Sequence, residues 1–229
     1  MKFKLLLLGI TLSQFVFAQQ PKIEKPDYTS IESTIKVKDS KMYYPVLLDR
    51  YIKLDTTLTR EELKLLYYGF LFQDSYSVYG HSDYSDTLTK ILEKESLSMP
   101  DYDRIIKYEK LVLKDYPFRL RDLNILSYAY EKKGMSDSSK IIDNKLTHLV
   151  GAILSTGNGE EEKNAWHVIS VEDEYDIISL LGYKFGENQS LTGKGCDYMT
   201  LEANSDGIKG LYFDVNKILE AEEKLFKEK

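Results

Sequence analysis

The chain has 229 residues, of which 42% are hydrophobic, and its 37 acidic and 31 basic side chains give a formal net charge of −6. That length and apolar content allow one large domain or two small ones. The acidic balance argues against nonspecific binding to nucleic acid or to anionic membrane surfaces.

The N-terminus predicts a secretory signal peptide. Two lysines precede an apolar run at about 5–17, and Val16-Phe17-Ala18 places small or medium residues at the −3 and −1 positions of a cleavage site. The run falls short of the roughly 20 residues that span a membrane. We therefore expect residues 1–18 to be removed after about Ala18, which lowers the net charge from −6 to −8 because Lys2 and Lys4 leave.

The single cysteine, Cys196, bears on anchoring and on the disulfide question. A bacterial lipoprotein needs a cysteine directly after the cleavage point, and this chain has Gln19 there, so no lipid anchor is expected. One cysteine cannot form a disulfide within the chain, so the fold depends on packing even in an oxidising compartment. We expect a periplasmic or secreted protein without a stable membrane anchor after cleavage.

The N-terminal part of the mature chain is predicted to be helical after a short lead-in. Residues 19–39 lack clear periodicity and contain two prolines, which indicates a partly ordered segment. Residues 40–156 carry apolar stripes at helical spacing. Thr59 and Glu62 form a capping box, and Gly134 is placed to end another helix. The expected helices occupy about 44–54, 59–71, 84–95, 100–113, 117–133 and 136–156, with a loop at 73–83.

The hydrophobic period changes in the C-terminal part, residues 157–229. Strands are predicted at 166–171, 196–201 and 208–215, and turn residues at 204–207 make the last two an antiparallel hairpin. Short helices are expected after Ser170 and from Asn216. The prediction is an α+β fold, with N-terminal antiparallel helical hairpins followed by a small antiparallel sheet packed on them as one unit.

The predicted hairpin at 117–150 partly resembles a tetratricopeptide repeat. The residues that carry the resemblance are Leu123, Leu126, Ser127, Tyr130, Gly134 and Ser139. Asp143 stands where that family has a large aromatic residue, and no second copy appears at the family's 34-residue offset. The resemblance covers about 30 residues and implies a helical hairpin only.

A second pattern of motifs extends over about 40–216. Its members are Tyr43-Tyr44-Pro45, Asp55-Thr56-Thr57-Leu58-Thr59, Leu66-Tyr67-Tyr68-Gly69-Phe70, Gly157-Asn158-Gly159, Ala165-Trp166-His167-Val168-Ile169, Asp173-Glu174-Tyr175 and Gly210-Leu211-Tyr212-Phe213-Asp214-Val215. In these motifs and their order the chain resembles a family of exported Bacteroidetes proteins, domain of unknown function 4919. The resemblance implies an envelope or secreted protein and implies no reaction.

The sequence predicts no catalytic residue, no metal site and no cofactor. His81, His148 and His167 form no pair or cluster at the spacing of a zinc site. The segment 202–207 matches the start of a calcium-binding loop, but the residue that should be glutamate is Phe213, so a hairpin turn is expected. Neither glycine-rich turn, at 157–159 or 193–195, has the spacing of a phosphate-binding loop.

An acidic cluster, Glu172-Asp173-Glu174 with Asp176, leaves an enzyme as the alternative prediction. Paired carboxylates catalyse hydrolysis when burial raises the pKa of one of them. The same residues also open a helix, where the helix dipole favours negative charge without any activity. A hydrolase of glycan or peptide would need Asp173 or Glu174 in a concave pocket, beside another carboxylate, a tyrosine or a histidine.

Tyrosine is the one unusual bias, with 18 residues. Tyr67 and Tyr68, and Tyr76 and Tyr79 in the 73–83 loop, are candidates for an exposed binding surface, because tyrosine combines contact area with a polar tip. The alternative is that they face the core and bond to backbone groups. The main prediction is therefore a non-enzymatic binding or assembly module with a protein or glycan partner.

Overall fold

The computed structural model describes residues 23–227, so the predicted signal peptide and its cleavage site lie outside the described residues. The α-helices are α1 Tyr28–Ile35, α2 Tyr44–Ile52, α3 Arg60–Gly69, α4 Ser85–Leu92, α5 Met99–Asp115, α6 Leu120–Lys132, α7 Ser136–Leu154, α8 Val171–Leu180 and α9 Asn216–Lys227. The strands are β1 Trp166–His167, β2 Phe185–Leu191, β3 Cys196–Leu201 and β4 Gly210–Asp214. None of the helices between residues 23 and 227 is long and apolar enough to cross a membrane.

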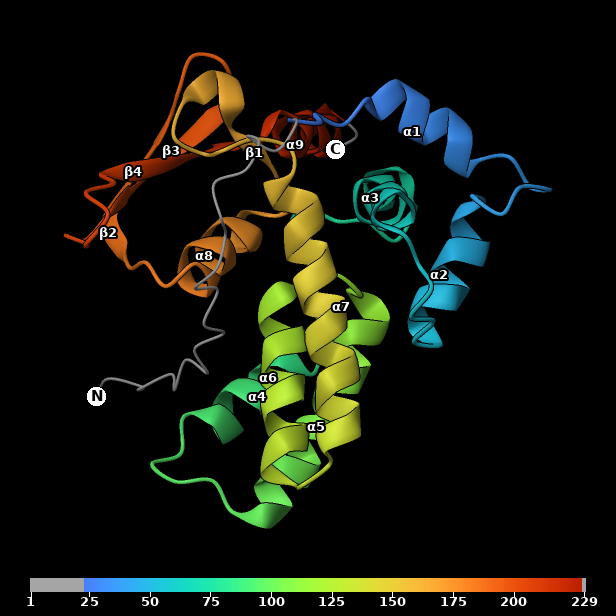
Figure 1. The fold of residues 1–229 in the computed structure, drawn as a ribbon, viewed down its shortest axis with the longest axis vertical. Coiled ribbons are helices and arrows are strands. Elements are labelled where there is room, and N and C mark those ends of the chain that lie inside the picture. The colour runs from blue at the N-terminus through green and yellow to red at the C-terminus, as the bar shows by residue number, and fades with distance from the viewer. Residues whose placement is uncertain (1–22, 228–229) are drawn as a thin grey trace.

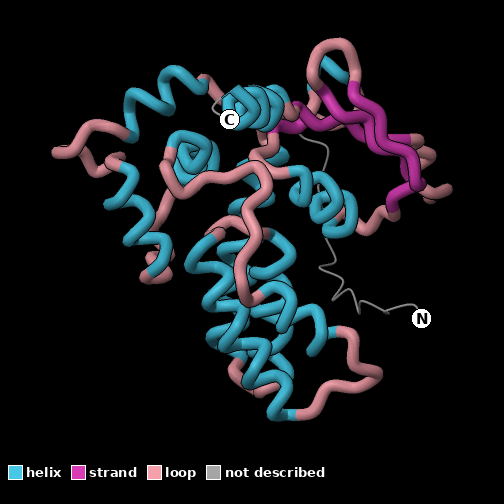
Figure 2. Tube along the Cα trace, turned by 180° about the vertical axis from the view of Figure 1, so that it is seen from behind, coloured by secondary structure: helices cyan, strands magenta, loops and turns pink. Residues whose placement is uncertain are grey.

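The helices form a tall body with the sheet at one upper corner. The three longest helices, α5, α6 and α7, lie side by side in the lower half, and α7 continues upward to meet α3 (Figure 1). Helices α1, α2 and α3 lie to one side of its upper end, whereas the sheet and α8 lie to the other. Seen from behind, all strands gather at that corner (Figure 2).

Local signals set most helix ends where the sequence predicts them. The Thr59–Glu62 capping box is confirmed, because the Thr59 hydroxyl accepts from the Glu62 N–H at 3.2 Å and the Glu62 carboxylate accepts from the Thr59 N–H at 2.8 Å. Gly134 ends α6 with a φ of 72°, a left-handed conformation that suits glycine. Helix α6 begins at Leu120 and not at Pro117, because residues 116–119 form a turn whose Pro117 carbonyl accepts from the buried Tyr51 hydroxyl at 3.0 Å.

The predicted lead-in contains a helix, α1, that the sequence pattern did not reveal. Asp27 caps it by accepting from the Ser30 N–H at 3.0 Å. Only Ile31 and Ile35 are buried, and two apolar residues four apart are too short a stripe to indicate a helix.

The α+β class is confirmed, but the sheet is mixed and not antiparallel. Its strand order is β1-β4-β3-β2, and β3 and β4 form the predicted antiparallel hairpin, with Tyr198 opposite Tyr212. The predicted strand at 166–171 is shorter in the structure, where β1 covers only residues 166–167. It pairs in parallel with β4, and α8, β2 and β3 form the connection between these two strands. The edge strand β2, which was not predicted, adds to β3.

One buried apolar cluster connects the helical part to the sheet. It runs from Ile31 through Leu66 and Leu149 to Phe213 and Ile218, all of them buried. The parts on either side of the predicted boundaries near residues 40 and 157 therefore share one core. The division of the chain into domains at these boundaries stays a prediction.

Candidate functional site

A small pocket forms where the 73–83 loop, the turn before α6 and the start of α8 meet. Its volume of about 40 Å³ holds a few water molecules, far below the roughly 300–1,000 Å³ of small-molecule sites. The lining comprises Phe70, Tyr76, Ser77, Val78, Gly80, Tyr116, Phe118, Arg119, Ile169, Ser170, Glu172 and Asp173. The pocket thus brings the tyrosine-rich loop and the acidic cluster together.

Asp173 forms the inner wall of the pocket and is 3% exposed. The Tyr67 hydroxyl donates to its carboxyl oxygen at 2.6 Å, and the same hydroxyl accepts from the Ile169 N–H at 3.3 Å. Burial raises the pKa of Asp173 to about 8, although the Tyr67 hydrogen bond opposes the rise. At neutral pH this carboxyl therefore holds a proton, in a network anchored to the backbone.

Arg119, which lines the pocket, connects the 73–83 loop to the rest of the protein. The Arg119 guanidinium donates to the Gly80 carbonyl at 2.8 Å, lies 4.8 Å from the Tyr116 ring centre and approaches Glu172 at 3.7 Å. A Cβ added at Gly80 would lie 2.2 Å from the Tyr116 ring, so a larger residue there would displace that ring. With these contacts the arginine fixes the loop to the body and is not free for a ligand.

More acids lie around α8 and behind the pocket, and Asp176 among them is half-buried. Asp176 accepts from the Arg121 N–H at 3.0 Å and so caps α6, whose own N-cap residue offers no side-chain bond. Glu174 is fully buried, and its carboxyl oxygens have no hydrogen-bond partner among the described residues. Glu109 is also fully buried and lies beside Asp122. Burial raises the pKa of Glu174 to about 9, with nearby Asp197 adding to the rise.

The acidic cluster is therefore not the solvated first turn that the helix-dipole interpretation implies. Only Glu172 fits that interpretation, because it is exposed, whereas Asp173 and Glu174 are buried. Asp173 has a tyrosine partner in a pocket, as the hydrolase alternative requires, and Glu174 does not line that pocket.

The four candidate tyrosines differ in how far their side chains are buried. Tyr67 and Tyr68 are fully buried, and the Tyr68 hydroxyl donates to the His167 carbonyl at 3.1 Å, so the prediction of an exposed surface is wrong for both. Tyr76 is half-buried and donates to the Ile169 carbonyl at 2.8 Å. Tyr79 alone is well exposed, at 64%, and its hydroxyl bonds to the Glu222 carboxylate of α9.

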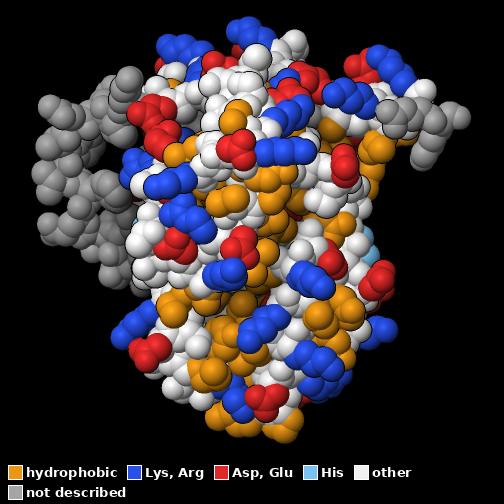
Figure 3. Space-filling model, turned by 90° about the vertical axis from the view of Figure 1, so that its right-hand side faces the viewer, with side chains coloured by type: hydrophobic (Ala, Val, Ile, Leu, Met, Phe, Trp, Pro, Cys, Tyr) orange, Lys and Arg blue, Asp and Glu red, His pale blue; other side chains and the backbone are white. Residues whose placement is uncertain are grey.

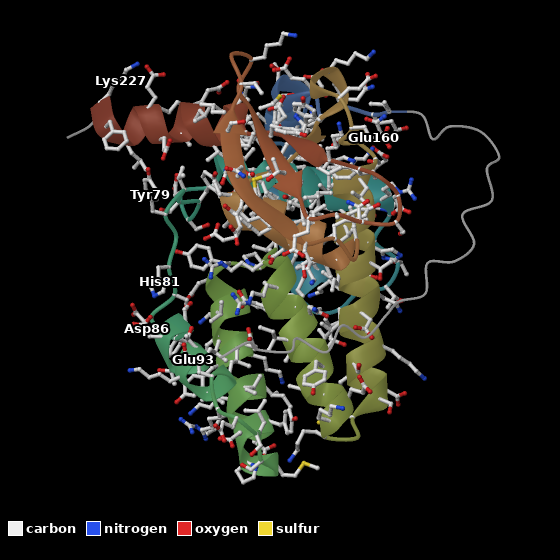
Figure 4. The ribbon with its side chains drawn as sticks, turned by 90° about the vertical axis from the view of Figure 1, so that its left-hand side faces the viewer. Tyr79, His81, Asp86, Glu93, Glu160 and Lys227 are labelled. Carbon is white, nitrogen blue, oxygen red and sulfur yellow. The ribbon has the colours of Figure 1, made fainter. Side chains whose placement is uncertain are left out.

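The end of α9 extends the surface around Tyr79. The apolar stripe of this helix begins with Ile218, which is buried, but its last turn exposes Leu225 by 40% and Phe226 by 67%. Because Phe226 lies four residues beyond Glu222, it continues the helix face that contacts Tyr79. Figure 4 shows the helix end at Lys227 standing clear of the body, with Tyr79 on the loop below it. We call residues 222–227 the α9 overhang.

A different kind of apolar exposure occurs on the side of α2. Val46, Ile52 and Leu54 are each at least 39% exposed there. On that face charged side chains are scattered among the apolar ones (Figure 3). Dispersed apolar exposure of this kind is ordinary for a protein surface.

No group of three or more histidine, cysteine, aspartate or glutamate side chains within residues 23–227 is arranged to hold a metal ion. His81 lies at the surface 3.6 Å from Asp86, whereas His167 is buried with its Nδ1 3.2 Å from the Tyr28 hydroxyl. Cys196 is buried as a free thiol, and burial raises its pKa to about 11, so it is unreactive at neutral pH.

A family model described as domain of unknown function (DUF4919) matches residues 29–224. The chain belongs to this family. No curated protein and no solved structure matches it. The match spans both the helical part and the sheet, and it includes α8 and the pocket of this DUF4919 member.

Sequence reasoning missed two features of this DUF4919 site. The apolar stripe of α9 is visible in the sequence, but no pattern tells which half of it the body covers. The burial of Asp173 and Glu174 has a faint signal, because helical spacing puts them on the same side as Ile177 and Ile178, which are core residues.

Proposed function

We propose that this DUF4919 protein is an exported, non-enzymatic binding module that recognises a protein partner through Tyr79 and the α9 overhang. The observation that carries the proposal is the half-covered stripe of α9. Its Ile218 is buried in the first turn, whereas Leu225 and Phe226 are exposed in the last turn, which follows the Glu222 that bonds to Tyr79. Aromatic side chains such as Tyr79 and Phe226 are typical of the centre of a protein interface. An aliphatic side chain such as Leu225 offers a sugar ring no face to stack on, which favours protein over glycan.

A photo-crosslinking amino acid placed at position 226 should capture one discrete partner in cells that produce the protein. Position 79 should capture the same partner, because the Tyr79 side chain contacts the overhang. Position 52 is the matched control, since Ile52 is 55% exposed on the α2 side and lies outside the proposed surface. Adducts identified by mass spectrometry decide the outcome. Equal capture at 52 and 226, or capture of glycan alone, would contradict the proposal.

Export rests on the N-terminal pattern of two lysines, an apolar run and Val16-Phe17-Ala18. The natural protein should therefore begin near Gln19 and fractionate with the periplasm or the medium. N-terminal sequencing checks this, and retention of Met1 in a cytosolic fraction would exclude export without affecting the proposed binding surface.

A hydrolase of glycan or peptide is the second candidate, favoured by the protonated Asp173 in a pocket with exposed Glu172 at its mouth. It ranks second for two reasons. Asp173 is already bonded to Tyr67, and the pocket is too small for a sugar ring or a peptide unit. Asp173→Asn is the variant that would abolish such an activity.

A further inference from the structure

Helix α8 directs its acidic side chains at three separate elements. Asp173 meets the Tyr67 hydroxyl of α3, and Asp176 meets the first turn of α6. Glu174 is fully buried on the side of the sheet, where Asp197 of β3 is its strongest charged neighbour. One ten-residue helix thus lies between the helical body, to which two of its carboxyls bond, and the sheet, against which Glu174 is buried without a hydrogen bond among the described residues.

The surroundings of these carboxyls contain few cations. The titratable and charged groups that face them are Tyr67, Tyr68, Tyr76, Arg121, Asp122, Glu172, Tyr175 and Asp197. Arg119 is held by Gly80 and lies within 4 Å of Asp122 and Glu172, and Arg121 reaches Asp176 with its backbone N–H. Among residues 23–227 no cation faces Glu174, so within this part of the chain its ionised form would be buried without a partner, which is strongly unfavourable.

We propose that α8 is a proton-held latch, which stays seated between the helical body and the sheet while its buried carboxyls are protonated and is released when they ionise. Burial raises the pKa of Asp176 to about 7, of Asp173 to about 8 and of Glu174 to about 9, so release belongs to mildly alkaline pH. Ile169, Ser170, Glu172 and Asp173 line the pocket, so release also opens it. The latch does not depend on the proposed binding function.

Release has a definite pH signature. A released carboxyl ionises near its ordinary pKa of about 4, whereas a seated one stays protonated up to its raised pKa. Below that raised pKa, the opening equilibrium rises about tenfold per pH unit for each carboxyl freed. Between pH 6 and pH 8, Glu174 alone, with its pKa of about 9, changes that equilibrium by about 100-fold.

Hydrogen exchange measured by mass spectrometry at pH 6, 7 and 8, corrected for the intrinsic rate, tests the latch. Peptides from 171–181 should lose protection as the pH rises and should be at least tenfold less protected at pH 8 than peptides from 136–154 in α7. Equal protection of the two segments at every pH would mean that only global unfolding occurs, and would overturn the proposal.

Two variants separate the latch from ordinary packing. Glu174→Gln keeps the side-chain shape without the acid. In this variant, the opening equilibrium measured by hydrogen exchange of peptides 171–181 should rise about tenfold less per pH unit than in the wild type. Asp173→Asn keeps an acceptor for Tyr67 and should do the same, so it carries the test if Glu174→Gln fails to fold. Glu202→Gln, at an exposed site paired with Lys184 and outside the proposed binding surface, should leave the slope unchanged. An unchanged slope in the two α8 variants would also overturn the proposal.

Discussion

Gly157→Ala is expected to destabilise the protein by about 3 kcal/mol or more, the upper range for overpacking. A Cβ at this position would lie 2.0 Å from the Asn164 carbonyl oxygen and 2.7 Å from that of Ala165. Both atoms belong to the backbone, so no side-chain rotation relieves the contact. The same loop accepts the Trp166 indole N–H at 3.0 Å, and the Gly159 N–H donates to Asn164. The added methyl group should therefore displace β1 from the end of α7.

Gly151→Ala is the matched control for this prediction. Gly151 lies within α7 with nothing inside 4 Å of the added Cβ, so alanine should stabilise the helix by about 0.5–1 kcal/mol. Urea unfolding followed by the fluorescence of Trp166, the single tryptophan, measures both variants. Equal stability of the two variants would show that the 157–165 loop does not hold the backbone this closely.

The sequence predicts those elements whose signals are local. The Thr59–Glu62 box and Gly134 act within a few residues, so the helix limits they predict agree with α3 and α6. Strand β2 has no such signal, because its residues do not alternate between apolar and polar and Glu187 has a φ of 69°. It forms through pairing with β3, including a bond from the Asn188 N–H to the Thr200 hydroxyl, which only the tertiary structure supplies.

The candidate site was partly predictable for the same reason. Composition and spacing identified the tyrosine-rich loop and the acidic cluster separately, but nothing in the sequence placed Tyr76 beside Asp173 in one pocket. Charge alone suggests solvent exposure, and that rule failed for Glu174 because helix spacing and the sheet together enclose it. The depth of Tyr67 and Tyr68 likewise depends on the elements that cover them.

The free energy of unfolding should be greatest near pH 4 to 5 and should fall by about 2–5 kcal/mol between pH 6 and pH 8. Asp173 and Glu174 have folded-state pKa values of about 8 and 9, above those of the unfolded chain, so the folded protein holds more protons across this range. Each such group contributes stability that is complete below about pH 4 and declines by about 1.4 kcal/mol per pH unit as the pH rises toward its folded pKa.

Other groups lower the free energy of unfolding as the pH falls in the acid range, and so give its pH profile a maximum. Hydrogen bonds with Thr57 and Arg50 lower the pKa of Asp55 to about 2, and the Lys94 contact lowers the pKa of Asp101, so both contribute stability that is lost below about pH 4. Burial lowers the pKa of His167, whose contribution is complete above about pH 6.5 and declines below it. One histidine opposes several acids between pH 5 and 8, so the acids determine the slope.

Urea unfolding at pH 5, 6, 7 and 8 checks the profile, with Glu174→Gln as the informative variant. The variant should lose less stability than the wild type between pH 6 and pH 8, by about 1.4 kcal/mol per pH unit. Glu202→Gln, an exposed glutamate on the sheet side, should follow the wild type. A wild-type maximum at pH 8 would mean that the acids around α8 are ionised in the folded protein, and that cations or water reach carboxyls that are enclosed in this structure.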